Sequence, residues 1–192
     1  ANDSMQTVIF KLIHSSQSAL RNTLRTVDAI SIKRTADILL NANHIHIYGQ
    51  SGGYVAGLYM QQMLLRAGIL CQAVNDNLDM QLAANTLTQN DVAVGIAYSG
   101  EIRSVIQALT TARAKRAKVI VITATNGSSM AKLAHQVLLY SNDIPDDLHY
   151  LHIGSICEIS IIGLLQSEIL MRENQHEKVA SVAKNIITSR KK

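Results

Sequence analysis

The sequence predicts an α/β domain in which a five-stranded parallel sheet is covered by helices on both faces. Short apolar runs alternate with longer segments of helical periodicity along most of the 192 residues. Residues 92–97 and 119–123 are apolar at nearly every position, as strands buried on both faces are. Polar turns follow three of the strands and should therefore meet at the carboxyl edge of the sheet. Helical connections between parallel strands require right-handed crossovers.

Two helices are predicted before the first strand, within residues 1–43. Residues 5–27 carry apolar side chains close to a helical repeat, and Asp3 or Ser4 is the predicted N-cap. A second helix is expected to begin at Ser31. Because both helices precede the sheet, we expect them to cover it or to form a contact between subunits.

The parallel α/β core is predicted to span residues 44–140. Its expected strands are 44–48, 70–74, 92–97, 119–123 and 137–140. The helices expected between them are 54–67, 78–87, 102–116 and 128–134. Gly68 is the expected C′ residue of the first of these helices.

The last part of the chain, residues 149–190, is predicted to be helical. A loop with the one proline, Pro145, precedes a helix over 149–172, and another helix is expected over 177–189. No break in composition marks a second domain, so residues 1–192 are expected to form a single domain.

The composition points to a compact cytoplasmic protein, with 47% hydrophobic and 17% charged residues. The formal net charge of +4 is small and no basic stripe is interleaved with aromatic residues, so this segment is not expected to bind DNA by itself. Neither a membrane span nor a secretory signal is predicted. Cys71 and Cys157 lie far apart in apolar segments and are expected to be buried free thiols.

The turn between the first strand and its helix predicts an anion site. Its predicted ligand-binding residues are Gly49, Gln50, Ser51, Gly52 and Gly53. A strand, a glycine turn and a helix in succession aim backbone N–H groups at one point, which attracts phosphate. The turn lacks the spacing of a nucleoside-triphosphate P-loop and of the dinucleotide fingerprint. A dinucleotide site and a turn that only connects two elements are the alternatives.

A second turn adds hydroxyl groups to the same edge of the sheet. Its predicted ligand-binding residues, with the helix that follows, are Ser99, Gly100, Glu101 and Ser104. Hydroxyls beside helix N-termini suit a sugar phosphate, which carries about −1.5 to −2 charges at neutral pH. The alternative is that each serine caps its own helix. We favour capping for Ser128 and Ser129, and ligand contact for Ser99.

The residue types exclude several other chemistries. The histidines do not cluster with a carboxylate or thiolate, and His44 and His46 share one strand face, where ordinary packing is the favoured role. Ser99 has no obvious base nearby in the sequence that would make it a nucleophile. Accordingly, neither a metal nor a cofactor is expected.

Three segments, 48–56, 97–101 and 121–134, resemble the sugar isomerase (SIS) domain. The leading helices resemble those that precede this domain in bacterial RpiR-type transcriptional regulators. The resemblance implies a three-layer α-β-α, flavodoxin-like fold and homodimers or homotetramers with ligand sites near the subunit contact. It further implies that Ser51, Ser99 and neighbouring amides hold the phosphate of a sensed sugar phosphate. DNA would be bound by an N-terminal helix-turn-helix domain that is not in this chain.

The two motifs depart from the usual SIS pattern. The first loop usually reads Gly-x-Gly-x-Ser, so Ser51 takes either the second glycine position or, with a shift of one residue, the serine position. The second motif usually reads Ser-x-Ser-Gly-x-Thr, and Ala97 and Ile102 replace two of its hydroxyl residues. These departures leave a third alternative, a domain that only dimerises.

Glu158 is the residue on which the alternative function, a free-standing phosphosugar isomerase, depends most. SIS isomerases need a base, commonly a glutamate or a histidine, to move a proton between adjacent sugar carbons. Glu158 lies in an apolar stretch of the predicted helix 149–172, where burial without a partner is costly. It is therefore a predicted ligand-binding residue of a sensor or, alternatively, the base of a free-standing isomerase. A structural pair with a nearby Lys or Arg is the third possibility for this carboxylate.

Overall fold

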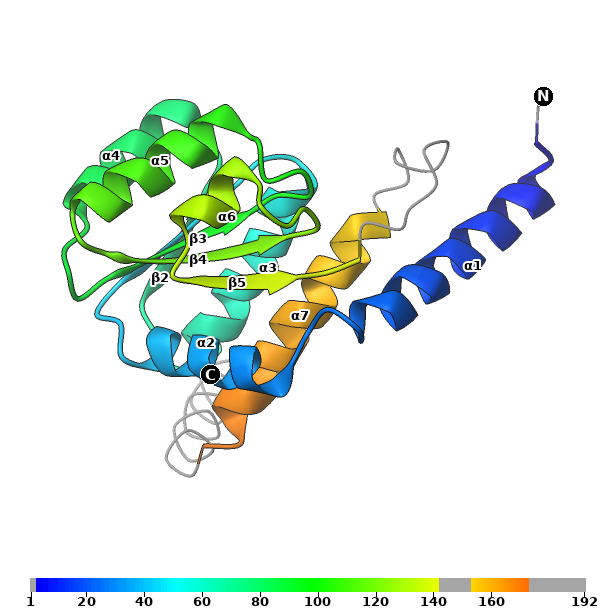
Figure 1. Ribbon diagram of the computed structural model, residues 1–192, viewed down its shortest axis with the longest axis horizontal. Helices are drawn as coiled ribbons and strands as arrows, with labels where there is room; N and C mark the ends of the chain where they lie inside the picture. The colour runs from blue at the N-terminus through cyan, green and yellow to red at the C-terminus, as the bar shows by residue number, and fades with distance from the viewer. Residues whose placement is uncertain (1–2, 142–152, 173–192) are drawn as a thin grey trace, which may run out of the picture.

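A computed structural model describes residues 3–141 and 153–172, in which five strands alternate with seven helices (Figure 1). The strands are β1 (Ile45–Gly49), β2 (Cys71–Val74), β3 (Val92–Ile96), β4 (Lys118–Thr123) and β5 (Gln136–Leu139). The helices are α1 (Met5–Thr23), α2 (Ala29–Leu40), α3 (Gly52–Arg66), α4 (Asn77–Thr86), α5 (Arg103–Ala114), α6 (Ser129–Leu133) and α7 (Ile153–Leu170). The predicted helix 177–189, residues 149–152 and Pro145 lie outside the described residues.

The sheet is parallel throughout, with the strand order β2-β1-β3-β4-β5. This is the flavodoxin-like order, in which the direction of strand addition reverses between β1 and β3. The predicted fold class is confirmed. The carboxyl ends of these two strands are the point at which open α/β sheets bind ligands.

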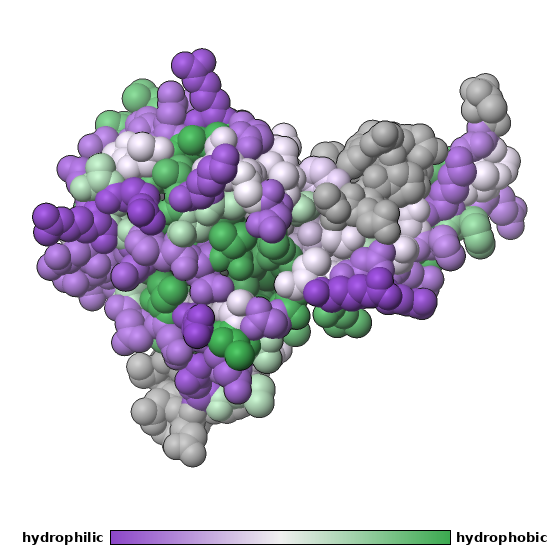
Figure 2. Space-filling view, viewed as in Figure 1, coloured by the Kyte–Doolittle hydropathy of each residue, from purple (hydrophilic) through white to green (hydrophobic). Residues whose placement is uncertain are grey.

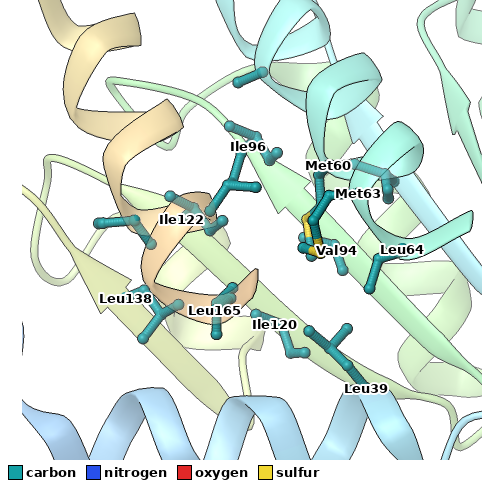
Figure 3. Packing of buried hydrophobic residues seen from close by; sticks show 14 of the residues in the cluster. Leu39, Met60, Met63, Leu64, Val94, Ile96, Ile120, Ile122, Leu138 and Leu165 are labelled. Atoms are coloured by element: carbon teal, nitrogen blue, oxygen red, sulfur yellow. The ribbon is translucent and has the colours of Figure 1, made fainter. Parts of the chain in front are cut away.

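Two apolar clusters, one on each face of the sheet, produce the three layers. On one face, alternate strand residues such as Ile47, Val94 and Ile120 pack against α1, α2, α3 and α7. Figure 3 shows Val94 and Ile120 in this cluster. On the other face, residues such as Ala93 and Val121 pack against α4, α5 and α6. The period of two along each strand divides the apolar residues between the faces.

Several predicted helix ends are confirmed by hydrogen bonds. Ser4 is the N-cap of α1 and accepts from the N–H of Thr7 at 3.2 Å. Ser128 caps α6 by accepting from the N–H of Ala131 at 3.3 Å. Gly68 follows α3 with a φ of 75°, as expected for a C′ glycine.

Three predicted boundaries were wrong. α1 ends at Thr23 rather than near residue 27, because the hydroxyls of Thr23 itself and of Thr26 in the turn that follows bind the end of β5. α2 begins at Ala29 rather than at Ser31, because the Asp28 side chain caps it by accepting from the N–H of Ser31 at 2.8 Å. α3 begins at Gly52, two residues before the predicted start.

α7 has the length and apolar composition of a membrane-crossing helix, but those properties alone are weak evidence for a span. Its buried residues belong to the core on the face of the sheet that α3 also covers, as Leu165 illustrates in Figure 3. Cys157 of α7 is fully buried, and Cys71 is half-buried; both thiols are free, as predicted. Burial raises the pKa of Cys71 to about 11.

Candidate functional site

A cavity of about 250 Å³ opens at the reversal point of the sheet, beyond the carboxyl ends of β1 and β3. Three separate segments line it, namely residues 50–53, 97–102 and 154–158. The lining residues are Gln50, Ser51, Gly52, Gly53, Ala97, Tyr98, Ser99, Ile102, Gly154, Ser155 and Glu158. Among these lining residues, all from the described part of the chain, there is no Lys, Arg or His.

The first segment brings the N-terminus of α3 to the cavity. Gly53 lies so close to the carbonyl oxygen of Ile96 that a Cβ at this position would collide with it. Only glycine therefore allows α3 to start directly against β3. This close approach places the first amides of α3, those of Gly52 and Gly53, beside the cavity.

Ser51 precedes α3 in a strained conformation. Its φ of 48° and ψ of −123° lie where glycine is favoured, and its side chain makes no capping hydrogen bond to α3. The possibility that this serine merely caps its own helix is therefore excluded. Gly53 has no room for a side chain, so the hydroxyl of this loop comes from Ser51. Ser51 supplies it from a backbone conformation that glycine usually adopts.

The second segment is held by the third polar turn of the sheet edge, residues 124–129, which follows β4. The hydroxyls of Thr123 and Thr125 donate to the carbonyl oxygen of Tyr98 at 3.0 and 3.3 Å. The N–H of Ser129 donates to Glu101 Oε1 at 2.8 Å, and hydrogen bonding from Ser129 lowers the pKa of Glu101. The third turn thus braces the second, while lying outside the cavity itself.

Ser99 is exposed and borders the cavity from this braced loop. Its Oγ accepts from the N–H of Glu101 at 3.2 Å, which fixes the oxygen in a tight local turn. Gly100 follows with a φ of 66°, and a Cβ there would strike the hydroxyl of Ser128. These contacts hold the loop against the third turn, and the Ser99 hydroxyl borders the cavity from it.

The third segment is the first two turns of α7, which supply Glu158. This carboxylate is 2% exposed, and its Oε1 accepts a hydrogen bond of 2.7 Å from the hydroxyl of Tyr140, which is 1% exposed. Burial and the neighbouring carboxylate raise the pKa of Tyr140 far above its usual range, so it stays protonated and remains a donor. Gly154 allows α7 to pack against the ring of Tyr98.

The structure gathers six of the ten predicted site residues at the cavity. These are Gln50, Ser51, Gly52, Gly53, Ser99 and Glu158. The other four do not line it. Gly49 is buried behind Gly53, Gly100 packs against Ser128, Glu101 binds the third turn, and Ser104 is buried in the first turn of α5.

Sequence reasoning missed Gly154 and Ser155. Both lie one helical turn before Glu158, so their spacing within the predicted helix 149–172 carried the signal. Ala97 and Ile102, which replace hydroxyl residues of the usual SIS motif, both line the cavity. These two positions of the wall between β3 and α5 are accordingly apolar, and Ser99 is the hydroxyl residue that remains there.

Metal binding finds no support in residues 3–141 and 153–172. No group of three or more His, Cys, Asp or Glu side chains there could hold a metal ion. His46 lies next to the buried Tyr48, with its Nδ1 3.4 Å from the tyrosine hydroxyl. Burial lowers the pKa of His46.

The chain is similar in sequence to known bacterial proteins. The chain is 27% identical over 185 residues to an uncharacterised HTH-type transcriptional regulator of Caldanaerobacter subterraneus, covering 96% of this chain and 65% of that protein. It is 28% identical over 137 residues to the HTH-type transcriptional regulator RpiR of Escherichia coli, covering 71% of this chain and 46% of that protein. The chain thus spans about half to two thirds of these relatives.

The fold is shared with a solved structure. The Vibrio vulnificus NanR protein, complexed with ManNAc-6P, superposes with a TM-score of 0.87 at 20% identity, covering 95% of this chain and 70% of that one. The SIS domain model matches residues 38–150, which include the sheet and the first two segments of the cavity. This chain belongs to the SIS domain family.

Proposed function

We propose that this chain is the phosphosugar-sensing domain of an RpiR-type transcriptional regulator. The observation that carries the proposal is the cavity at the reversal point of the sheet, where an uncapped helix N-terminus meets the hydroxyls of Ser51 and Ser99. DNA binding would belong to a helix-turn-helix segment outside this chain, and ligand binding would modulate it. The relatives that are HTH-type regulators support this assignment.

The phosphate would bind at the end of the cavity formed by β1 and β3. The amides of Gly52 and Gly53 carry the partial positive charge of the α3 N-terminus, and Ser51 adds a hydroxyl donor. Ser99 faces the same space from the braced loop. Ala97 and Ile102 add no donor, so we expect a modest affinity for the phosphate group.

The sugar would extend toward α7. Glu158 supplies a carboxylate acceptor, and Gln50 and Ser155 add further polar groups at the rim. Such a set suits the hydroxyl donors of a sugar. The volume of about 250 Å³ favours one phosphorylated monosaccharide over a nucleotide sugar. NanR, which shares the fold, is complexed with ManNAc-6P, so this compound belongs in any ligand screen.

The chain is further proposed to form cytoplasmic homodimers or homotetramers. Large apolar side chains on α1 are more than half exposed, among them Met5, Ile9 and Phe10. An apolar groove of about 700 Å³ also lies between α1, α2 and α7. Figure 2 shows apolar side chains gathered around β5 and α7 on one face of the molecule. Exposed apolar surface of this kind is typical of subunit contacts.

A thermal-shift screen against sugar phosphates tests the sensor function. A ligand at 100 times its dissociation constant should stabilise the fold by about 2.7 kcal/mol. Ser99→Ala should abolish the shift, because it removes a hydroxyl from the phosphate end. Ser160→Ala is the matched control, since that hydroxyl lies on α7 outside the cavity and donates to its own helix. If no sugar phosphate stabilises the wild-type protein, the sensor function is wrong.

One observation favours a second candidate, a phosphosugar isomerase. Glu158 is a buried carboxylate in the cavity wall, the arrangement expected of a base that moves a proton between sugar carbons. NMR of each stabilising sugar phosphate incubated with the protein in deuterated buffer separates the two functions. A sensor should leave the carbon-bound protons in place, whereas an isomerase would exchange them with solvent, and Glu158→Gln would stop that exchange.

A further inference from the structure

A path of buried hydrogen bonds leads from the cavity to the first helix of the chain. It begins at Glu158, whose carboxylate is held by the hydroxyl of Tyr140 at 2.7 Å. Tyr140 directly follows β5, so the side chain that contacts Glu158 is attached to the carboxyl end of that strand. This hydrogen bond therefore links the position of Glu158 to the position of the end of β5.

The end of β5 is tied in turn to the last turn of α1. The N–H of Ser141 donates to Thr23 Oγ1 at 3.1 Å, and both residues are 6% exposed. The hydroxyl of Thr26, in the turn after α1, donates to the carbonyl oxygen of Leu139 at 2.8 Å. These two bonds hold the strand end and the helix end together from both sides.

The Thr23 hydroxyl is fully engaged in this contact. While it accepts from Ser141, it donates to the carbonyl oxygen of Ala19 one turn back in α1, at 2.8 Å. Because a buried polar group that loses its partner is costly, the strand end and the helix end should move together.

α1 is the helix best placed to respond. Only Ala19 and Thr23 are buried among its 19 residues, and both lie in its second half. Figure 1 shows that its first half projects away from the sheet. A small rotation at Thr23 would therefore displace the opposite end of a helix about 28 Å long.

We infer that Tyr140, Ser141 and Thr23 couple the occupancy of the cavity to the position and stability of α1. A ligand that donates a hydrogen bond to Glu158 alters the hydrogen bond between this carboxylate and Tyr140, and thereby the position of the end of β5. The hydrogen bonds of Ser141 and Thr26 then shift the end of α1 with it. The inference rests on the proposed sensor function, because it requires a ligand at Glu158. Tyr140 and Thr23 are positioning residues, since neither lines the cavity.

Hydrogen exchange of α1 tests the coupling. ManNAc-6P is the probe, replaced by the sugar phosphate with the largest thermal shift if ManNAc-6P gives none; inorganic phosphate, which cannot reach both ends of the cavity, is the comparator. Saturation with the sugar phosphate should change exchange at residues 19–24 about 5-fold or more, the lower range of allosteric coupling. Inorganic phosphate should leave these amides within about 2-fold of the free protein.

Two variants locate the path. Thr23→Val keeps the shape of the side chain without its hydroxyl, and it should reduce the ligand effect on α1 to less than about 2-fold while the protein still binds the sugar phosphate. Thr23→Ser retains the hydroxyl and should preserve the effect. Tyr140→Phe interrupts the path at the other end and carries the test if Thr23→Val does not fold.

The outcomes separate the inference from the function on which it rests. Binding without any change in α1 exchange would overturn the coupling and leave the sensor function standing. An unchanged ligand effect in Thr23→Val or Tyr140→Phe would overturn the proposed path. If no sugar phosphate binds the wild-type protein, it is the sensor function that fails.

Discussion

Ser51 combines a backbone conformation that glycine favours with the hydroxyl group of a serine. Its backbone adopts a conformation that costs a non-glycine residue about 1–3 kcal/mol, while its hydroxyl caps no helix. Strain held by the surrounding structure is typical of binding loops. We therefore interpret the strain as the cost of keeping a donor at the phosphate end of the cavity.

Substitutions at Ser51 should separate stability from binding. Ser51→Gly should raise the free energy of unfolding by about 1 kcal/mol, because glycine adopts this φ without a steric penalty. It should also weaken sugar-phosphate binding, because the hydroxyl is lost. Ser51→Ala should weaken binding without the gain in stability. Urea unfolding and the thermal-shift screen measure both effects, and a Ser51→Gly protein less stable than Ser51→Ala would contradict the assignment.

The site could be predicted from sequence where its residues follow a strand directly. Ser51 and Ser99 follow buried strands, so topology alone takes both to the carboxyl edge. Ser104 and Glu101 could not be placed, because the direction of a side chain at the start of a helix depends on packing. The hydrogen bond between Glu101 and Ser129 joins two loops that are 28 residues apart, which no local pattern encodes.

At the scale of elements, the contact between the start of α3 and β3 decides whether the cavity exists. Gly53 sits against the backbone of Ile96, so α3 begins where its first amides lie beside the cavity. The sequence pattern placed the start of α3 two residues later, since helical periodicity becomes visible only at Val55 and beyond. Helix ends fixed by close approach or by tertiary hydrogen bonds, as at Gly52 and Thr23, are not visible in periodicity.

Two glycine-to-alanine substitutions test this contact. Gly53→Ala should lower the free energy of unfolding by about 1–3 kcal/mol, because the added Cβ must push α3 away from β3. Gly163→Ala in α7 is the matched control, since none of the described residues, its own helix backbone apart, lies within 4 Å of a Cβ built there. It should stabilise the protein by about 0.5–1 kcal/mol. Equal stability of the two variants in urea unfolding would show that the contact with Ile96 is not tight.

At the scale of the whole molecule, the titration of two histidines links the stability of the fold to pH. Burial lowers the pKa of His46, and burial together with Arg113 and Lys118 lowers the pKa of His135. His135 Nδ1 accepts the N–H of Val119 at 2.8 Å, which requires an unprotonated nitrogen. Both histidines therefore favour the neutral form in the folded state.

The sign of the pH dependence follows from these shifts. The unfolded chain takes up protons at these histidines near pH 6.5, and the folded chain does so only at lower pH. Their contribution to stability is thus fully present above about pH 6.5 and is lost as the pH falls toward the folded pKa values. Urea unfolding between pH 7.5 and 5.5 should show this loss.

A variant separates His135 from the other titrating groups. In His135→Asn an amide oxygen can accept the N–H of Val119 without titrating, so the loss of stability between pH 7.5 and 5.5 should be smaller than in the wild type. A stability that does not change over this range in the wild type, or that falls equally in both proteins, would contradict the assignment to His135.

The cavity is built from segments at residues 50–53, 97–102 and 154–158, so its walls are separated by about 100 residues of chain. A nascent chain completes the first two walls long before α7 has been synthesised. Binding therefore cannot guide the early steps of folding, and it stabilises only the finished domain. A sugar phosphate should accordingly lower the unfolding rate of the domain without raising its folding rate, so it would stabilise the native state kinetically.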